Sequence, residues 1–257
     1  MPGSLTLSAG TLYGFLLTLA RVGGALVFVP LPGVKGAPEP ARAALAAGFA
    51  LALSARWPVI DDSAVTAARL AGWAVAEAAV GIAIGVAMAI ALEAFSLAAQ
   101  LLGLQAGYAY ASMVDPTTQA DSGVLVVFAQ IVSGVMFFAL GLDREVLRLF
   151  AGSLDAIPAG SYRFGAYSAQ PLIELGAALF SVGLRLALPV IALLAMLDMA
   201  LALLGRLNQQ LQLISLAFPA KMLAALLAVG WIAALFPRVL MAFGGLACAA
   251  ARRMLGL

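Results

Sequence analysis

Hydrophobic residues along the chain are collected into long runs, and polar residues stand mainly in the connectors between these runs. The connectors carry Pro, Gly and Asp, which favour turns. About 20 consecutive apolar residues suffice for a helix that crosses a bilayer. The pattern therefore predicts an all-α membrane protein with about six long, partly kinked hydrophobic helices in hairpins. The runs are residues 11–30, 41–55, 71–102, 124–142, 172–204 and 213–236.

The runs differ in length, which is unusual for a simple row of spanning helices. Residues 41–55 are short for a bilayer span, whereas residues 71–102 and 172–204 are longer than a span requires. Pro189 and Pro219 lie inside apolar runs, and an internal proline removes a backbone hydrogen bond. We therefore expect each of these prolines to kink its helix or to mark a break.

A Gly-rich segment, residues 103–123, separates the third and fourth runs. It is too polar for a lipid-facing span and too apolar for an ordinary solvated loop. Irregular backbone at membrane depth is tolerated only where protein buries it or a water-filled cavity meets it, because an unpaired amide in hydrocarbon is costly. We therefore predict a loop folded into the interior of a larger structure, with a firm turn at Asp115 and Pro116. The candidate residues of this loop are Gly103, Gln105, Gly107, Tyr108, Tyr110, Met113, Val114, Asp115 and Pro116.

Several charged residues interrupt the apolar runs. Each would cost about 2.5–3.5 kcal/mol at the centre of a bilayer, so it needs a partner, water or a place outside the lipid. In the third run, small residues such as Gly81 and Gly85 recur every four residues and allow another backbone to approach closely. Two interpretations are open: ordinary helix packing with the acids at helix ends, or charges that pair between helices or line a water-filled conduit. The charged residues are Arg21, Glu77, Glu93, Arg185, Asp198 and Lys221.

The composition supports a membrane-class protein and argues against several functions. Of the 257 residues, 64% are hydrophobic and 10% charged, and the mean hydropathy is +1.08. This leaves too little polar surface for a free soluble monomer, so membrane lipid or partner subunits must cover the remainder. The net charge of +2 is spread thinly, which argues against a nucleic-acid partner. Because the chain has no histidine and one cysteine, we predict neither an enzyme nor a cofactor or metal site.

Three short motifs stand out: Gly103-Leu-Gln-Ala-Gly107, then Val114-Asp115-Pro116 and, after an apolar run, Asp155-Ala-Ile-Pro158-Ala-Gly160. Together they resemble the FliR family of flagellar protein-export-gate components. Residues 207–221 also resemble the hairpin of FliQ, the small companion subunit of the same gate. The resemblance covers almost the whole chain. It implies a FliP-like helical part at 1–170 that contains the loop, followed by a FliQ-like hairpin part at 171–257, the two together forming one structural unit.

The resemblance also implies a function. The chain would be a subunit of the type III export gate, which with FliP-like and FliQ-like subunits conducts unfolded flagellar proteins across the bacterial inner membrane, at the flagellar basal body. The loop at 103–123 would plug the conduit, and many helices would stand raised out of the bilayer plane. The hairpin would face the cytoplasm near an FlhB-like switch protein. Its candidate residues are Gln209, Gln210, Pro219 and Lys221.

Other interpretations predict different observations. If the runs simply alternate, the distribution of Lys and Arg puts both termini in the cytoplasm, contrary to a cytoplasmic hairpin; we prefer the resemblance, because the positive-inside rule presumes ordinary spanning helices. The injectisome counterpart of the family, SctT, would share the fold and serve a virulence or symbiosis needle. A secondary transporter of small solutes is a second alternative, motivated by intramembrane charges and proline-broken helices. It would predict an inverted repeat, which the sequence does not display.

Overall fold

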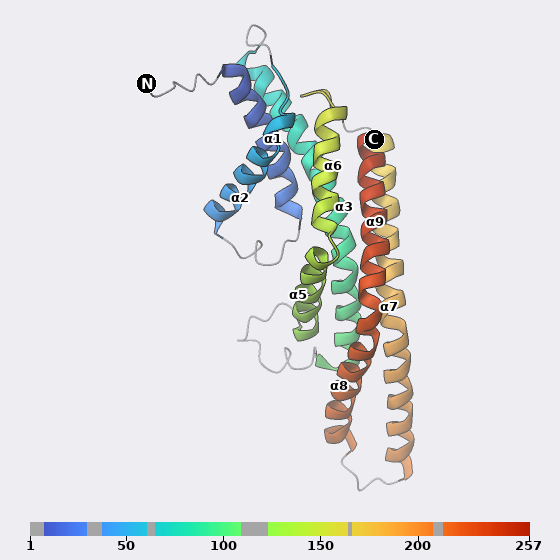
Figure 1. Ribbon diagram of the computed structural model, residues 1–257. Coiled ribbons are helices and arrows are strands. Elements are labelled where there is room, and N and C mark those ends of the chain that lie inside the picture. Colours follow the sequence, from blue (N-terminus) through green and yellow to red (C-terminus); the bar gives the residue numbers. More distant parts are fainter. Residues whose placement is uncertain (1–7, 30–37, 61–64, 109–122, 164–165, 208–212) are drawn as a thin grey trace. The chain divides into compact units, whose positions relative to one another are not determined.

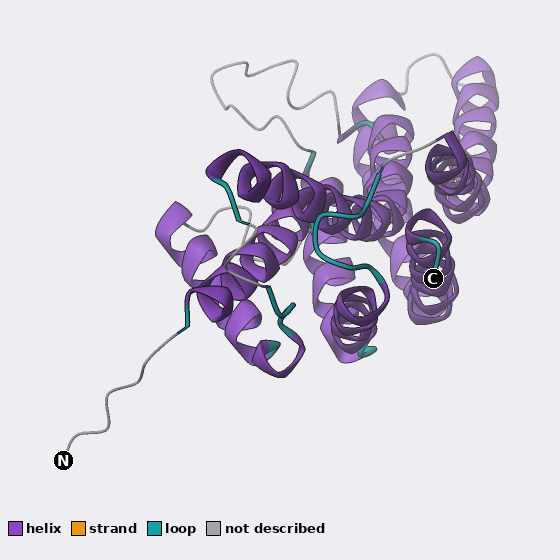
Figure 2. Ribbon diagram, turned by 90° about the horizontal axis from the view of Figure 1, so that it is seen from above, coloured by secondary structure: helices purple, strands orange, loops and turns teal. Residues whose placement is uncertain are grey.

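The computed structural model describes residues 8–29, 38–60, 65–108, 123–163, 166–207 and 213–257, and within these ranges the chain forms helices and no strand (Figures 1 and 2). The prediction of an all-α membrane protein is confirmed. Four helical stretches of the described chain are long and apolar enough to cross a membrane, namely Ala9–Phe28, Ala67–Ala106, Ala169–Arg206 and Ala217–Leu255.

Six helices coincide with the six predicted runs. In chain order they are α1 (Ala9–Phe28), α2 (Glu39–Ala52), α3 (Ala67–Ala106), α5 (Val124–Ala139), α7 (Ala166–Leu207) and α8 (Leu213–Ile232). Two further helices, α6 (Leu142–Ala156) and α9 (Phe236–Leu255), lie outside the predicted runs. Single turns of 3-10 helix follow α2 at Ser54–Arg56 (η1) and α8 at Ala233–Leu235 (η3).

Both missed helices are amphipathic rather than uniformly apolar. In α6 the buried residues Leu142, Val146, Leu149, Phe150 and Ser153 follow the helical period, and Asp143 and Glu145 occupy the first turn. A search for long apolar runs overlooks such a helix, because only one face is hydrophobic. The alternation of hydrophobic and charged residues at a period of 3.6 was the signal that could have found it.

Pro189 and Pro219 lie within α7 and α8, so neither marks a break, and a kink at each stays a prediction. The structure corrects one predicted boundary. The helix α3 continues to Ala106, so Gly103 and Gln105 are helical and the predicted loop begins later than residue 103. Helix propagation through these positions satisfies backbone groups that a loop would leave open.

The described helices group into two compact units. The first comprises Met1–Ala91, Gly141–Leu175 and Gly244–Leu257, and the second comprises Leu92–Leu140 and Gly176–Phe243. The helices α3, α7 and α9 each contribute residues to both units. Each unit has its own core of buried aliphatic and aromatic side chains.

In the first unit, α1 packs against α2, and the turn after α2 closes over them. The indole of Trp57 donates a hydrogen bond to the Ala50 carbonyl at 2.8 Å, and its ring lies 5.3 Å from that of Phe15, centroid to centroid. The thiol of Cys248 on α9 is buried beside the sulfur of Met88 on α3, at 3.9 Å. The ring contact of Trp57 and the contact of Cys248 join segments that are far apart in the sequence.

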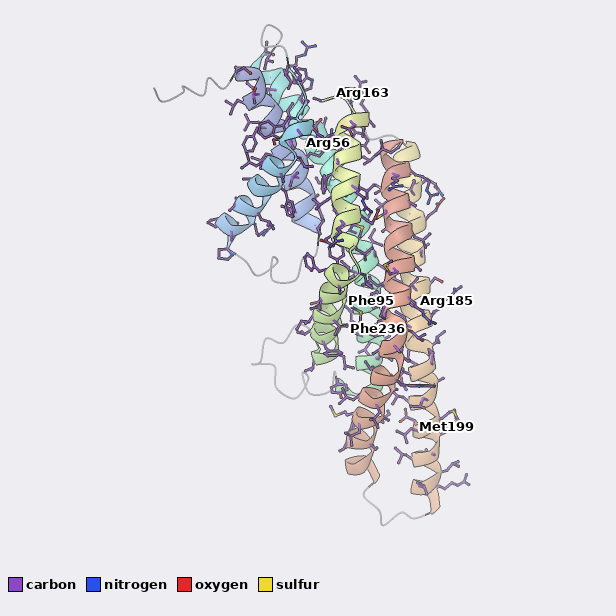
Figure 3. All side chains as sticks on the ribbon, viewed as in Figure 1. Arg56, Phe95, Arg163, Arg185, Met199 and Phe236 are labelled. Atoms are coloured by element: carbon purple, nitrogen blue, oxygen red, sulfur yellow. The ribbon has the colours of Figure 1, made fainter. Side chains whose placement is uncertain are left out.

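In the second unit, α3, α7 and α8 pack closely, and the start of α9 joins them. Gly183 allows α7 to approach α3, because a Cβ at this position would lie 3.1 Å from the Ala94 carbonyl oxygen. The rings of Phe95 and Phe236 meet edge to face with centroids 5.4 Å apart (Figure 3). Arg185 lies on α7 and points away from the other helices in the same view.

Candidate functional site

The C-terminal end of α3 is the first part of the candidate site. Gly107 has a φ of +86°, a left-handed conformation that glycine adopts without strain, and its N–H reaches the Leu104 carbonyl at 3.3 Å. A side chain at position 107 would also meet the ring of Phe218 on α8, with a Cβ 3.0 Å from Cδ1. The glycine therefore ends the helix and lets it lie directly against α8.

Two polar side chains at this end bind the hairpin formed by α7 and α8. Gln105 donates a hydrogen bond from Nε2 to Oδ2 of Asp198 on α7, at 3.4 Å. Tyr108 donates from its hydroxyl to the Met222 carbonyl on α8, at 3.2 Å. Burial raises the pKa of the Tyr108 phenol above its ordinary value.

Asp198 also forms an ion pair within the hairpin. Its Oδ1 lies 2.7 Å from Nζ of Lys221 on α8. The Lys221 side chain is 17% exposed and the Asp198 side chain is 41% exposed. The structure thus brings Gln105, a candidate of the predicted loop, together with Asp198 and Lys221, two of the charges that interrupt the apolar runs.

The remaining loop and hairpin candidates fall outside the described residues. They are Tyr110, Met113, Val114, Asp115 and Pro116 of the loop, and Gln209 and Gln210 of the hairpin.

Glu77 belongs to a second, buried cluster in the first unit. Its Oε2 accepts a hydrogen bond from Nε of Arg21 on α1 at 2.6 Å, and both side chains are 1% exposed. Arg21 also donates to the Ser153 hydroxyl at 3.0 Å and to the Ile157 carbonyl at 3.4 Å. The other carboxylate oxygen of Glu77 accepts from the Gly160 N–H at 3.0 Å. The pair is therefore saturated with partners, as a buried ion pair must be.

This cluster gives physical roles to the motif at 155–160. Gly160 has a φ of +72°, and a Cβ there would lie 1.7 Å from the Trp73 ring, so only glycine fits. Asp155 pairs with Arg56, and both side chains are exposed. The motif fastens the end of α6 to α3 and to the turn after α2.

The crossing of α1 and α3 has the close backbone approach that the sequence predicted. A Cβ on Gly81 would lie 1.8 Å from the Arg21 carbonyl oxygen, and one on Gly85 would lie 2.5 Å from the Ala25 carbonyl oxygen. Gly24 faces the Ala78 carbonyl in the same way, at 2.5 Å. These glycines bring Arg21 within reach of Glu77.

Glu93 and Arg185 are not brought into this network. Both are exposed, on α3 and α7 respectively, and the structure shows no ion pair for either among the described residues. Sequence reasoning counted Arg21 as an intramembrane charge but did not identify its partner, and it missed Ser153 entirely. An isolated serine on an amphipathic helix carries no signal that it will meet an arginine 132 residues away.

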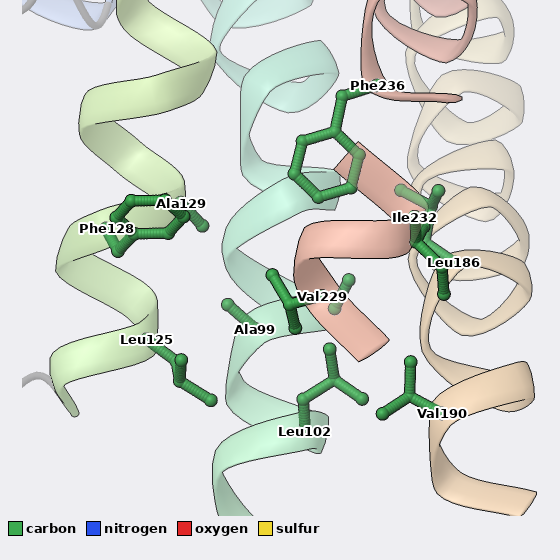
Figure 4. A pocket seen from close by; sticks show the side chains of 11 residues that line it. Ala99, Leu102, Leu125, Phe128, Ala129, Leu186, Val190, Val229, Ile232 and Phe236 are labelled. Atoms are coloured by element: carbon green, nitrogen blue, oxygen red, sulfur yellow. The ribbon is translucent and has the colours of Figure 1, made fainter. Parts of the chain in front are cut away.

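An apolar cavity of about 30 Å³ lies in the second unit (Figure 4). Phe128 and Ala129 of α5, Ala99 and Leu102 of α3, and Val229 of α8 are among the side chains that surround it. Its volume suits about one water molecule, but its lining offers no polar side chain to bind one. Within the described ranges, no three Cys, Asp or Glu side chains gather as metal ligands. The described candidate residues form ion pairs and closely packed helices, and we assign them no chemical step.

Comparison with known proteins links the chain to bacterial export. The flagellar biosynthetic protein FliR of Escherichia coli (strain K12) is 28% identical over 222 residues, which cover 86% of this chain and 83% of that protein. FliR of Pectobacterium carotovorum subsp. carotovorum is 30% identical over 158 residues, covering 62% and 60%. FliR of Bacillus subtilis (strain 168) is 26% identical over 219 residues, covering 80% and 81%.

These similarities confirm the resemblance to the FliR family that the motifs indicated. The family of bacterial export proteins, family 1, matches residues 12–244, a range that includes both the buried Arg21–Glu77 cluster and the α7–α8 hairpin. The chain therefore belongs to the bacterial export proteins, family 1.

Proposed function

We propose that this chain is a component of the flagellar type III protein export gate. With FliP-like and FliQ-like subunits it forms the conduit for unfolded flagellar proteins across the bacterial inner membrane, and the segment between α3 and α5 plugs this conduit. The family match and the flagellar names of the relatives support the proposal. The chain acts here as a structural conduit subunit and not as an enzyme.

The observation that carries the plug assignment is the docking of the start of this segment on the α7–α8 hairpin. Gly107 turns the chain at the end of α3, and Tyr108 is held to the Met222 carbonyl at 3.2 Å. The segment therefore leaves α3 from a fixed point. A plug needs a fixed attachment and a closure of modest stability, because a gating equilibrium shifts by a few kcal/mol.

The proposal keeps the division into a FliP-like part at 1–170 and a FliQ-like part at 171–257. The hairpin part, with Gln209, Gln210, Pro219 and Lys221, faces the cytoplasmic mouth near an FlhB-like switch protein. The exposed apolar residues of α7 and α8, such as Met196 and Trp231, are to be covered by partner subunits or by lipid.

The alternatives gain less support. An injectisome counterpart would share the fold, but the relatives described above are named as flagellar proteins. A transporter of small solutes gains no support from the same relatives, whose names describe flagellar biosynthesis.

Co-expression and membrane permeability test the proposal. The chain should co-purify with FliP-like and FliQ-like subunits. Deletion of residues 111–120 should leave this complex intact, because Gln105, Gly107 and Tyr108 are retained, and should make the membrane leak ions.

Replacement of the same ten residues by a Gly/Ser linker is the matched control for chain length. This variant should make the membrane leak ions as well, because the side chains proposed to pack in the conduit are lost. An assembled complex that stays tight after the deletion contradicts the plug assignment.

A further inference from the structure

An open pocket of about 390 Å³ lies in the first unit, beside the C-terminal end of α9. The segment that follows α6 forms one side of it and includes Ile157 and Arg163. The last residues of α9 form the other side and include Arg253 and Leu255. The volume is in the range of ligand-binding pockets, and the proposed function gives this pocket no role.

The pocket carries more positive than negative charge. Nη1 of Arg253 donates a hydrogen bond to Oε2 of Glu174 on α7 at 3.2 Å, and the Arg253 side chain is 57% exposed. A guanidinium has several N–H donors, so Arg253 retains some beyond this pair. Arg163 is also exposed, and the structure shows no ion pair for it within the described ranges. Because Glu174 balances only one of the two cations, the pocket is suited to an anionic group.

The acceptor groups at the end of α9 are already covered. Bare carbonyls at a helix C-terminus would repel a ligand that is rich in acceptor oxygens. Gly256 has a φ of +73°, and the N–H groups of Gly256 and Leu257 donate to carbonyls of the last turn at 3.3 and 2.9 Å. The Tyr162 hydroxyl donates to the Met254 carbonyl at 3.3 Å. These contacts leave the two guanidinium groups as the main charges in the pocket.

Two candidate membrane spans have their ends at this pocket. The span Ala217–Leu255 ends there, and the span Ala169–Arg206 begins beside it, since Glu174 contacts Arg253 (Figure 1). In the sequence, the two arginines of the last turn of α9 directly follow an uncharged stretch, residues 239–251. Basic residues at the end of an apolar helix are typical of the boundary between lipid and water, where they can bind phosphate headgroups.

We propose that this pocket binds the headgroup of an anionic phospholipid. Arg163 and Arg253 bind the phosphate, since a guanidinium matches the geometry of phosphate oxygens. Ala156 and Pro158 also line the pocket and expose apolar surface, against which the first methylene groups of the acyl chains pack. A soluble phosphate would gain only the contacts with the arginines. The apolar surface and the adjacent span ends therefore favour a lipid.

Native mass spectrometry tests this assignment on the full chain, purified from membranes together with the subunits that co-purify with it. Added phosphatidylglycerol should remain bound to the wild-type protein. Arg163→Gln and Arg253→Gln should each weaken this binding about 5-fold, the change expected for the loss of one basic residue near an anionic lipid. Both side chains are exposed, so the variants should unfold at nearly the wild-type temperature. Unchanged affinity in both variants would overturn the proposal.

Arg252→Gln is the matched control for charge. Arg252 is exposed and precedes Arg253 on the same turn of α9, but it does not line the pocket. Its replacement should weaken the binding of phosphatidylglycerol less than Arg253→Gln does. Equal losses in the two variants would indicate a general attraction to a basic surface and would overturn the assignment of a specific pocket.

Two further ligands distinguish the possible occupants. Phosphatidylcholine, whose headgroup has no net charge, and glycerol phosphate, which has no acyl chains, should both bind more weakly than phosphatidylglycerol. Glycerol phosphate that binds as tightly as the lipid would assign the pocket to a soluble phosphate and overturn the proposal. The proposal also fails if no phosphatidylglycerol stays bound while the co-purified subunits protect Arg163 and Arg253 from phenylglyoxal, because an acidic segment of a partner would then occupy the pocket.

Discussion

Arg21–Glu77 in the first compact unit and Lys221–Asp198 in the second are both ion pairs between helices, and the two pairs differ in their access to water. In the first unit, Arg21 and Glu77 are each 1% exposed, and further hydrogen bonds to Ser153, Ile157 and Gly160 saturate them. In the second unit, the Lys221–Asp198 pair retains substantial exposure.

The difference in burial distinguishes an ion pair that stays closed from one that can open. Separating a fully buried pair leaves a charge in a low-dielectric interior, which is strongly unfavourable, whereas a partly exposed pair is replaced by contacts with water at little cost. The Arg21–Glu77 cluster is therefore suited to hold the fold in place. The Lys221–Asp198 pair is suited to a part of the molecule that moves.

The largest expected effect comes from removing one partner of the buried pair. Arg21→Met leaves Glu77 charged and buried, and it should lower the free energy of unfolding by about 3–5 kcal/mol. Thermal unfolding in detergent, or the amount of folded protein in the membrane, measures this change.

The double variant Arg21→Met with Glu77→Met is the control, because it removes both charges. It should be more stable than either single variant, since no unpaired charge remains. A double variant as unstable as the singles would show that the packing of the cluster, and not the charge pairing, dominates.

The next largest effect is expected at the crossing of α1 and α3, which also carries the Arg21–Glu77 pair. In Gly81→Ala the new Cβ would lie 1.8 Å from the Arg21 carbonyl oxygen, so α1 and α3 must separate. We expect a loss of about 1–3 kcal/mol of unfolding free energy. Gly72→Ala, on the same helix with open space around it, is the matched control and should stabilise α3 by about 0.5–1 kcal/mol. Equal unfolding temperatures for the two variants would contradict the close crossing.

Removing the cation of the accessible pair should cost less stability. Lys221→Met leaves Asp198 in contact with water, and we expect a loss of about 1 kcal/mol in the same unfolding measurement. The comparison with Arg21→Met is direct, because both variants replace a paired cation by methionine. A loss as large as that of Arg21→Met would remove the distinction between the two pairs.

The smallest effect is expected for the exposed pair of Arg56 and Asp155 in the first unit. Both side chains are largely in water, so Arg56→Ala should change the unfolding free energy by about 0–1 kcal/mol. Raising the salt concentration should reduce even this difference, because salt screens exposed charges. A large, salt-independent loss of unfolding free energy would show that this pair stabilises the fold more than its exposure predicts.

The sequence predicted the long apolar helices well, because hydrophobic burial and lipid exposure both require apolar runs of this length. It missed α6 and α9, which interleave hydrophobic and charged residues instead of forming uniform apolar runs. It also placed the end of α3 too early at Gly103, since a glycine inside an apolar helix is locally indistinguishable from one that ends it. Gly107, which adopts the left-handed conformation, also lies against Phe218 of α8, and the local sequence does not indicate this contact.

The candidate site was predictable in its residue types but not in its pairs. Glu77, Asp198 and Lys221 were identified because charges in apolar runs need partners. The choice of partner depends on tertiary packing: Arg21 is 56 residues from Glu77, and Gln105 is 93 residues from Asp198. Small residues at the α1–α3 crossing indicated a close approach, but they could not indicate which helix would approach.

The buried position of Cys248 has a practical consequence. The sole thiol of the chain is packed beside the sulfur of Met88, out of reach of water-soluble maleimides. A cysteine introduced at an exposed position outside the candidate membrane spans, such as Val59→Cys, would then be the preferred attachment point for a fluorophore or spin label without prior removal of the native one.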